Sequence, residues 1–191
     1  MQLKSKVVLK EKGSSAVLPS SFKEMLVSLK WTKDVDLDLM AFFDTKDGKK
    51  GGIYTNLLGG NLGDLNAHPF MKLSGDAGVG AQGGDNQEDL VISKLDNLAK
   101  IYIVALNYTV QQAGGSESFG DYDGGITVKT DGQKEEDSFG MLLDSMEKGT
   151  VALVATIDNT GVAGPKLIKE NKVMSLADLV AAVPAASVLT K

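Results

Sequence analysis

Two groups of oxygen-bearing side chains have the types and spacing that suit binding of a hard cation. The first is the pair Asp36 and Asp38, in the run DVDLDLMAFF. The second is the stretch GDAGVGAQGGDNQED, residues 75–89, which holds five glycines and four carboxylates. Because this stretch has hardly any apolar side chain, it cannot build a core, and a binding role has to be considered.

The Asp36 and Asp38 carboxylates are predicted to share one face of a strand. Side chains alternate along a strand, so Leu37 and Leu39 point to the other face, and the carboxylates lie roughly 6 to 7 Å apart. Aspartate is depleted from strands, and the two charges repel more strongly as water is excluded. A bound cation would offset this repulsion. The alternative is a solvated polar face of a half-exposed strand.

The glycine-rich stretch supplies many oxygen ligands and the backbone freedom to turn carbonyl groups inward. Calcium takes six to eight hard oxygen ligands at about 2.3 to 2.6 Å, whereas magnesium prefers fewer protein ligands and several retained waters. The stretch therefore predicts a calcium site, which Asp36 and Asp38 could close. Its candidate ligands are Asp76, Asp85, Asn86, Glu88 and Asp89.

Several other site types do not fit the sequence. An EF-hand beginning at Asp34 would need glycine at Leu39 and glutamate at Thr45. A phosphate-binding P-loop would need Gly-Lys-Ser/Thr after Gly80, where Ala81 and Gln82 follow. With no cysteine and one histidine, thiolate zinc sites and Cys-His nucleophile pairs are excluded.

Composition indicates a folded globular protein with an acidic surface. The 191 residues are 42% hydrophobic and 24% charged, which suits a single domain over residues 1–191. A net charge of −5 argues against nucleic acid and favours cations as partners. No long apolar run predicts a membrane span, and the start MQLKSKVVLK lacks a signal-peptide pattern, so we expect a cytoplasmic protein.

Short runs rich in β-branched and aromatic residues, separated by polar turns, predict an all-β protein: an antiparallel β-sandwich with a short C-terminal helix. The run IYIVALNY predicts a central strand covered on both faces. Ser175 is expected to cap a helix that Pro184 ends, and Asp47-Gly48 predicts a hairpin with a type I′ turn. The predicted strands are 6–10, 25–30, 35–43, 52–56, 89–93, 100–107, 125–130 and 151–157.

These motifs, taken in order, resemble the TerD-type tellurium-resistance and stress-response proteins. The likeness rests on Trp31, the Asp36-Leu37-Asp38 run, a strand ending at Asn56, Gly75-Asp76, and the Gly84 to Glu88 run. The strands LVISKL and IYIVALNY and the later Ser118-Phe119-Gly120 also fit. The resemblance covers about residues 7–128, and residues 132–191 are only loosely matched.

The resemblance implies a calcium-binding, non-enzymatic β-sandwich that works with other stress-response proteins. It assigns ligand roles to Asp36, Asp38 and Asp76, and to the closing Asp85, Asn86 and Glu88. Ala77 stands where the family usually has asparagine, and GGDNQED replaces its usual acidic ending. We therefore expect one calcium ion, with a second as the alternative, and Asp89 either replaces a lost carboxylate or starts the next strand.

Two other functions stay open on the sequence. A metal-assisted hydrolase acting on a phosphate or ester would need a general base, for which the candidates are the acids already assigned to the metal, together with Tyr54 and His68. A structural or assembly protein without a metal site would use the acidic segments for solubility only.

Overall fold

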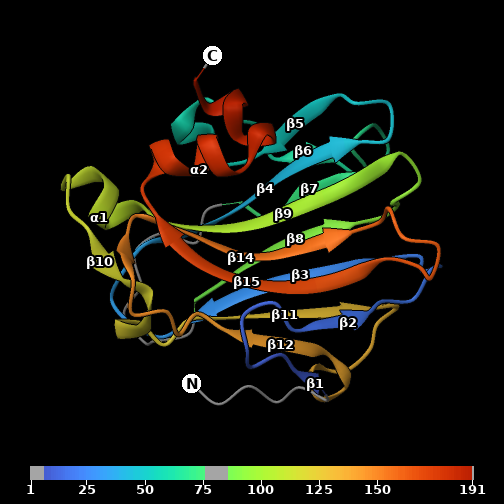
Figure 1. Ribbon diagram of the computed structural model, residues 1–191, viewed down its shortest axis with the longest axis horizontal. Coiled ribbons are helices and arrows are strands. Elements are labelled where there is room, and N and C mark those ends of the chain that lie inside the picture. The colour runs from blue at the N-terminus through green and yellow to red at the C-terminus, as the bar shows by residue number, and fades with distance from the viewer. Residues whose placement is uncertain (1–6, 76–85, 191) are drawn as a thin grey trace.

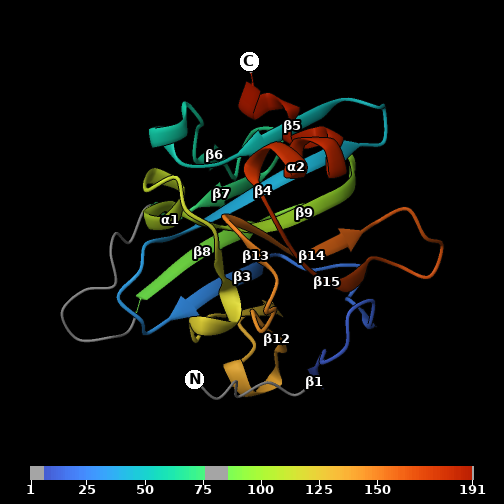
Figure 2. The same cartoon turned by 60° about the vertical axis from the view of Figure 1, so that its left-hand side comes forward.

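Two antiparallel sheets pack face to face in this protein, as Figures 1 and 2 show for a computed structural model of the chain. The structure describes residues 7–75 and 86–190. Sheet A has the strand order β1-β12-β11-β3-β8-β7-β6, and sheet B has the order β2-β15-β14-β9-β4-β5. Among the described strands, β1 joins β12 in parallel, and the other neighbours are antiparallel. The predicted β-sandwich is confirmed.

The bounds of the elements follow the order of each sheet. Sheet A holds β1 (Val7–Val8), β12 (Phe139–Leu142), β11 (Gly125–Thr130), β3 (Met25–Trp31), β8 (Asn86–Ile92), β7 (Met71–Leu73) and β6 (Gly63–Asp64). Sheet B holds β2 (Ser15–Val17), β15 (Lys166–Met174), β14 (Val151–Asp158), β9 (Leu98–Asn107), β4 (Leu37–Thr45) and β5 (Lys50–Ile53). A small third sheet pairs β10 (Glu117–Ser118) with β13 (Lys148–Gly149). The helices are α1 (Tyr108–Gln112), α2 (Leu176–Ala182) and the 3₁₀ segments Asn56–Leu58, Phe119–Asp121, Glu135–Asp137 and Pro184–Thr190.

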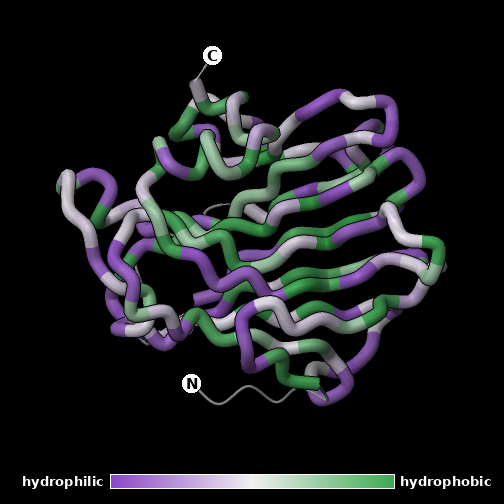
Figure 3. The backbone as a smooth tube through the Cα atoms, in the orientation of Figure 1, coloured by the Kyte–Doolittle hydropathy of each residue, from purple (hydrophilic) through white to green (hydrophobic). Residues whose placement is uncertain are grey.

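The main core fills the space between the two sheets. Leu37, Leu39 and Ala41 of β4 point into it, together with Trp31 and Leu90 of sheet A. In Figure 3 the hydrophobic colour is concentrated along the strands, and the connections are mostly hydrophilic. Burial of these alternate side chains is the main favourable contribution to the fold.

A second apolar cluster covers the outer face of sheet B. Met40 and Phe42 of β4 and Val104 of β9 pack there against Leu179 of α2 and Val183. Ser175 caps α2 as predicted, because its side chain accepts the Asp178 N–H at 3.1 Å. Strand β9 is therefore covered on both faces, which confirms the prediction for IYIVALNY. In the described part of the chain, no helix is long and apolar enough to cross a membrane.

The hairpin that joins β4 to β5 differs from the predicted turn. Gly48 has φ 83°, but Asp47 does not have positive φ, so the turn is not type I′. Thr45 instead closes a longer loop, with its N–H bonded to the Lys49 carbonyl at 2.8 Å and its hydroxyl accepting the Lys49 N–H at 2.8 Å. The Thr45 hydroxyl also donates to the Asp47 carboxylate.

We expect the Asp47 carboxyl to titrate well below the ordinary range. Hydrogen bonds from Thr45 and from the Lys49 ammonium, at 2.9 Å, lower its pKa from 3.8 to about 2. Because the folded-state pKa is depressed, the stabilisation is present above pH 3.8 and is lost as the pH falls through about 2. A carboxyl-carbon NMR titration measures this midpoint, and Lys49→Gln should raise it. A midpoint near 3.8 in the parent protein would contradict the hydrogen-bonded loop.

Candidate functional site

The N-terminal half of β4 forms an edge of sheet B. Strand β5 pairs with β4 only from Ala41 to Asp44, so the part before Ala41 has β9 on one side and no β5 partner on the other. At this edge the Leu39 N–H donates to Glu88 Oε2 at 2.6 Å. A carboxylate from sheet A therefore caps the edge of sheet B and ties the two sheets together.

Asp36 and Asp38 lie at the same edge, and they are buried. The exposed fraction is 8% for Asp36 and 2% for Asp38. Leu37 and Leu39 point into the main core, and Asp38 lies on the opposite face, next to Met40 on the same strand, as predicted. Asp36 was predicted to lie on this strand as well, but β4 begins at Leu37. The alternative of a solvated polar face is wrong, because water does not reach these side chains freely.

The backbone of Asp36 is held by the start of α1. The Tyr108 N–H donates to the Asp36 carbonyl at 2.9 Å, and the Asp36 N–H donates to the Thr109 hydroxyl at 3.1 Å. Asn107 caps the helix by accepting the Val110 N–H at 3.0 Å. The short helix therefore fixes the direction in which the chain enters β4.

Strand β8 separates its three candidate ligands between two faces. Asn86 and Glu88 point inward and are buried, with exposed fractions of 8% and 4%. Asp89 points outward, where its carboxylate accepts hydrogen bonds from the Ser28 hydroxyl at 2.6 Å and from the Gln87 amide at 2.8 and 2.9 Å. The Asp89 carboxylate therefore already has local partners, on the face away from Glu88.

A small pocket at the edge of β4 brings two of the predicted ligands together. Asp38 and Glu88 both line it, as do Thr55, Gly75 and the leucines Leu39, Leu62 and Leu73. Gly75 is the first residue of the glycine-rich acidic stretch, and it lines this pocket. Asp36, Asn86 and Asp89 do not line the pocket, and Asp76 and Asp85 lie outside the described residues.

Thr55 and Gly75 were not among the predicted site residues. Thr55 lies two residues after the end of β5, and its hydroxyl accepts the Leu57 N–H at 3.3 Å at the start of the 3₁₀ segment. The signal for Thr55 in the sequence is a polar residue just after the apolar end of β5.

The chemistry of the pocket fits a calcium ligand set but does not complete it. Asp38, Glu88 and Thr55 carry hard oxygen donors, which calcium prefers, whereas the three leucines of the lining offer none. In residues 7–75 and 86–190, no three Asp, Glu or His side chains are gathered closely enough to hold a metal by themselves. Calcium would need further oxygen ligands, from residues 76–85 or from water.

The two candidate general bases that are not acids lie elsewhere. The Tyr54 hydroxyl donates to the Val188 carbonyl at 3.3 Å, beneath the C-terminal segment. His68 is exposed, and its ring lies edge-on to Phe43 with 5.4 Å between ring centroids. Neither residue lines the pocket of Asp38 and Glu88.

Comparison with known proteins adds no relative to this description. No protein-family model, no curated protein and no solved structure matches the chain. The class that the structure defines is a two-sheet antiparallel β-sandwich with a short C-terminal helix. The resemblance to tellurium-resistance proteins stays a prediction from the sequence.

Proposed function

We propose that this chain is a calcium-binding, non-enzymatic module of the tellurium-resistance and general stress-response type, working in the cytoplasm with other stress-response proteins. The observation that carries the proposal is the pocket that Asp38 and Glu88 line together. Their carboxylates are buried and come from two different sheets. The acidic stretch that begins at Gly75 starts at the same pocket and contains Asp76 and Asp85.

The electrostatics of two buried carboxylates favour a cation between them. Charges interact more strongly where water is excluded, so repulsion between Asp38 and Glu88 is greater than it would be at the surface. A divalent cation in the pocket would turn this repulsion into attraction to a shared ion. The folded state binds the ion because only the fold brings β4 and β8 together.

Calcium should therefore raise the melting temperature of the protein. A ligand that binds only the folded state stabilises it by about 2.7 kcal/mol at one hundred times its dissociation constant. Asp38→Asn and Glu88→Gln should each remove most of the shift, measured by thermal unfolding with and without millimolar calcium. Glutamine keeps an oxygen that can accept the Leu39 N–H, so Glu88→Gln separates the charge from the structural hydrogen bond.

Asp89→Asn is the matched control, because it removes a carboxylate from the outward face of the same strand. We expect this variant to keep the calcium-dependent shift, even if its stability without calcium falls slightly. If the parent protein gives no binding heat and no melting shift at millimolar calcium, the proposal fails. If Asp89→Asn loses the shift and Glu88→Gln keeps it, the assignment of ligands is wrong.

The stress-response role has its own test. Partners should be recovered from extracts of stressed cells with the parent protein in calcium, and lost in chelator or with Asp38→Asn. Recovery of the same partners under all of these conditions would argue for an assembly role that does not depend on the metal.

A further inference from the structure

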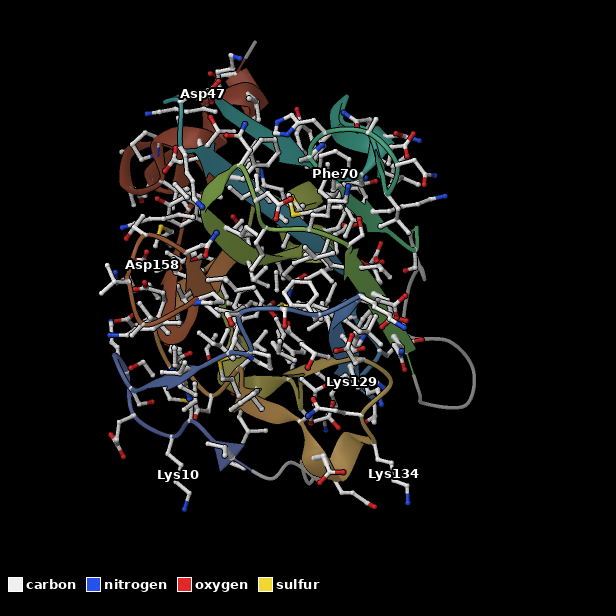
Figure 4. The ribbon with its side chains drawn as sticks, turned by 90° about the vertical axis from the view of Figure 1, so that its right-hand side faces the viewer. Lys10, Asp47, Phe70, Lys129, Lys134 and Asp158 are labelled. Carbon is white, nitrogen blue, oxygen red and sulfur yellow. The ribbon has the colours of Figure 1, made fainter. Side chains whose placement is uncertain are left out.

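A groove lies at the end of the sandwich away from the Asp38 and Glu88 pocket. Strand β3 begins at Met25 beside Ile92, the last residue of β8, and ends at Trp31 beside Asn86, where the acidic stretch meets β8. Beyond the Met25 end, the loops 20–23, 65–70 and 93–96 meet and enclose a volume of about 670 Å³. Figure 4 views the sandwich from this end, with Phe70 labelled. The volume is in the range of small-molecule sites.

The floor of the groove is apolar and its rim is polar. Phe22, Leu65 and Phe70 are half-buried, and Leu95 is buried beneath them. Exposed polar side chains, including Asn66, surround these residues on the three loops. Most of the lining residues are polar, so the groove combines an apolar base with many polar groups that could orient a ligand.

Phe70 is held in place by its backbone. It has φ 58°, a left-handed conformation that bulky residues rarely adopt and that costs about 1 to 3 kcal/mol. Its N–H donates to the Ala67 carbonyl at 2.7 Å, and its carbonyl accepts the Ser93 N–H at 2.9 Å. The Ser93 hydroxyl also donates to the Leu65 carbonyl at 2.9 Å, which ties two walls of the groove together. The aromatic ring is therefore presented by a fixed framework.

The charges on the rim favour an anion. The Lys94 ammonium lies 4.7 Å from the centre of the Phe70 ring, and a second lysine, Lys23, is exposed and also lines the groove. In the part of the chain that the structure describes, neither ammonium forms a salt bridge with a carboxylate. Asp96 is the one acidic side chain among the described lining residues, which leaves the rim positive but disfavours a multiply charged ligand.

We propose that this groove binds a small organic anion with an apolar body and one negative charge. The apolar body lies against Phe70, Phe22 and Leu65, and the charged group faces Lys94 and Lys23. This inference does not depend on calcium binding, because it uses none of the residues of the Asp38 and Glu88 pocket.

The test uses 3-phenylpropanoate as the probe and uncharged 3-phenylpropanamide as its matched control. In ¹H–¹⁵N correlation spectra of the full chain, we expect saturable shifts of the Ser93, Lys94 and Leu95 amides, with a dissociation constant on the order of a millimolar. The amide should bind several-fold more weakly. Lys94→Gln should weaken binding of the anion about two- to fivefold, the range for an exposed charge pair, and should leave binding of the amide unchanged.

Phe70→Asn removes the ring and keeps a residue that tolerates the left-handed backbone. We expect it to weaken binding of the anion at least tenfold, and Lys12→Gln, an exposed lysine outside the groove, to leave it unchanged. If Phe70→Asn does not fold, the Lys94→Gln comparison decides alone. The proposal is overturned if neither probe shifts these amides, if both bind equally well, or if Lys94→Gln and Lys12→Gln have the same effect.

Discussion

Replacing Trp31 with alanine should lower the free energy of unfolding by about 3 to 5 kcal/mol, the cost of truncating a large core side chain. Trp31 is fully buried at the end of β3, and its indole N–H donates to the Val35 carbonyl at 2.8 Å. That bond holds the residue before Asp36, so the variant should also reduce the calcium-dependent melting shift. The loss can be measured by urea unfolding monitored with circular dichroism. Tryptophan fluorescence is not suitable, because the variant lacks the protein's one tryptophan.

Trp31→Phe separates the packing of the ring from the hydrogen bond. Phenylalanine keeps most of the apolar surface but leaves the Val35 carbonyl without its donor, which should cost about 1 to 3 kcal/mol. If Trp31→Ala loses less than about 1 kcal/mol, the indole does not hold the core as the structure indicates. If Trp31→Phe alone abolishes the calcium response, the Val35 bond matters more for the site than the packing does.

The predicted strands that carry strong apolar patterns match the structure closely. Strands β3, β9, β11 and β14 lie within two residues of their predicted positions. Strand β15 was missed, because KLIKENKVM places Lys169 at a buried position and has Asn171 at φ 45°. Both features break the two-residue alternation by which a strand is recognised. A register shift in the partner strand β14, between Leu153 and Ala155, accompanies the irregularity.

Only part of the candidate site could be predicted, because local sequence patterns do not specify burial or exact strand ends. The alternation was correct for Asp38, but β4 begins at Leu37, so Asp36 precedes the strand, and the burial of both side chains depends on packing that no local pattern specifies. Strand β8 was predicted to begin at Asp89, whereas it begins at Asn86. Three residues of additional strand place Glu88 and Asp89 on opposite faces, a separation that a loop would not impose.

Lys169→Ala should destabilise the protein by about 2 to 4 kcal/mol, because it removes a buried, charged group that connects three segments. The side chain is 1% exposed, and its ammonium donates to the Lys10 carbonyl at 3.0 Å and to the Asp144 carboxylate at 3.1 Å. Its backbone N–H donates to the Ser14 carbonyl. Lys169 therefore holds the segment around Lys10 and Ser14 against β15 and the chain at Asp144. These contacts lie near the edges of the two sheets, where β12 is next to β1 and β15 is next to β2.

Two variants distinguish the parts of this contact. Asp144→Asn should cost no more than about 1 kcal/mol, because the Asp144 side chain is half-exposed and an amide oxygen can still accept the hydrogen bond. Lys169→Met keeps the volume without the charge, and should recover much of the stability lost in Lys169→Ala. Hydrogen exchange at the Leu9 amide, which donates to the Gly140 carbonyl at 2.9 Å, should speed up in Lys169→Ala and stay slow in Asp144→Asn. If Asp144→Asn lost as much free energy of unfolding as Lys169→Ala, the ion pair with Asp144, and not the bond to Lys10, would hold the N-terminal segment in place.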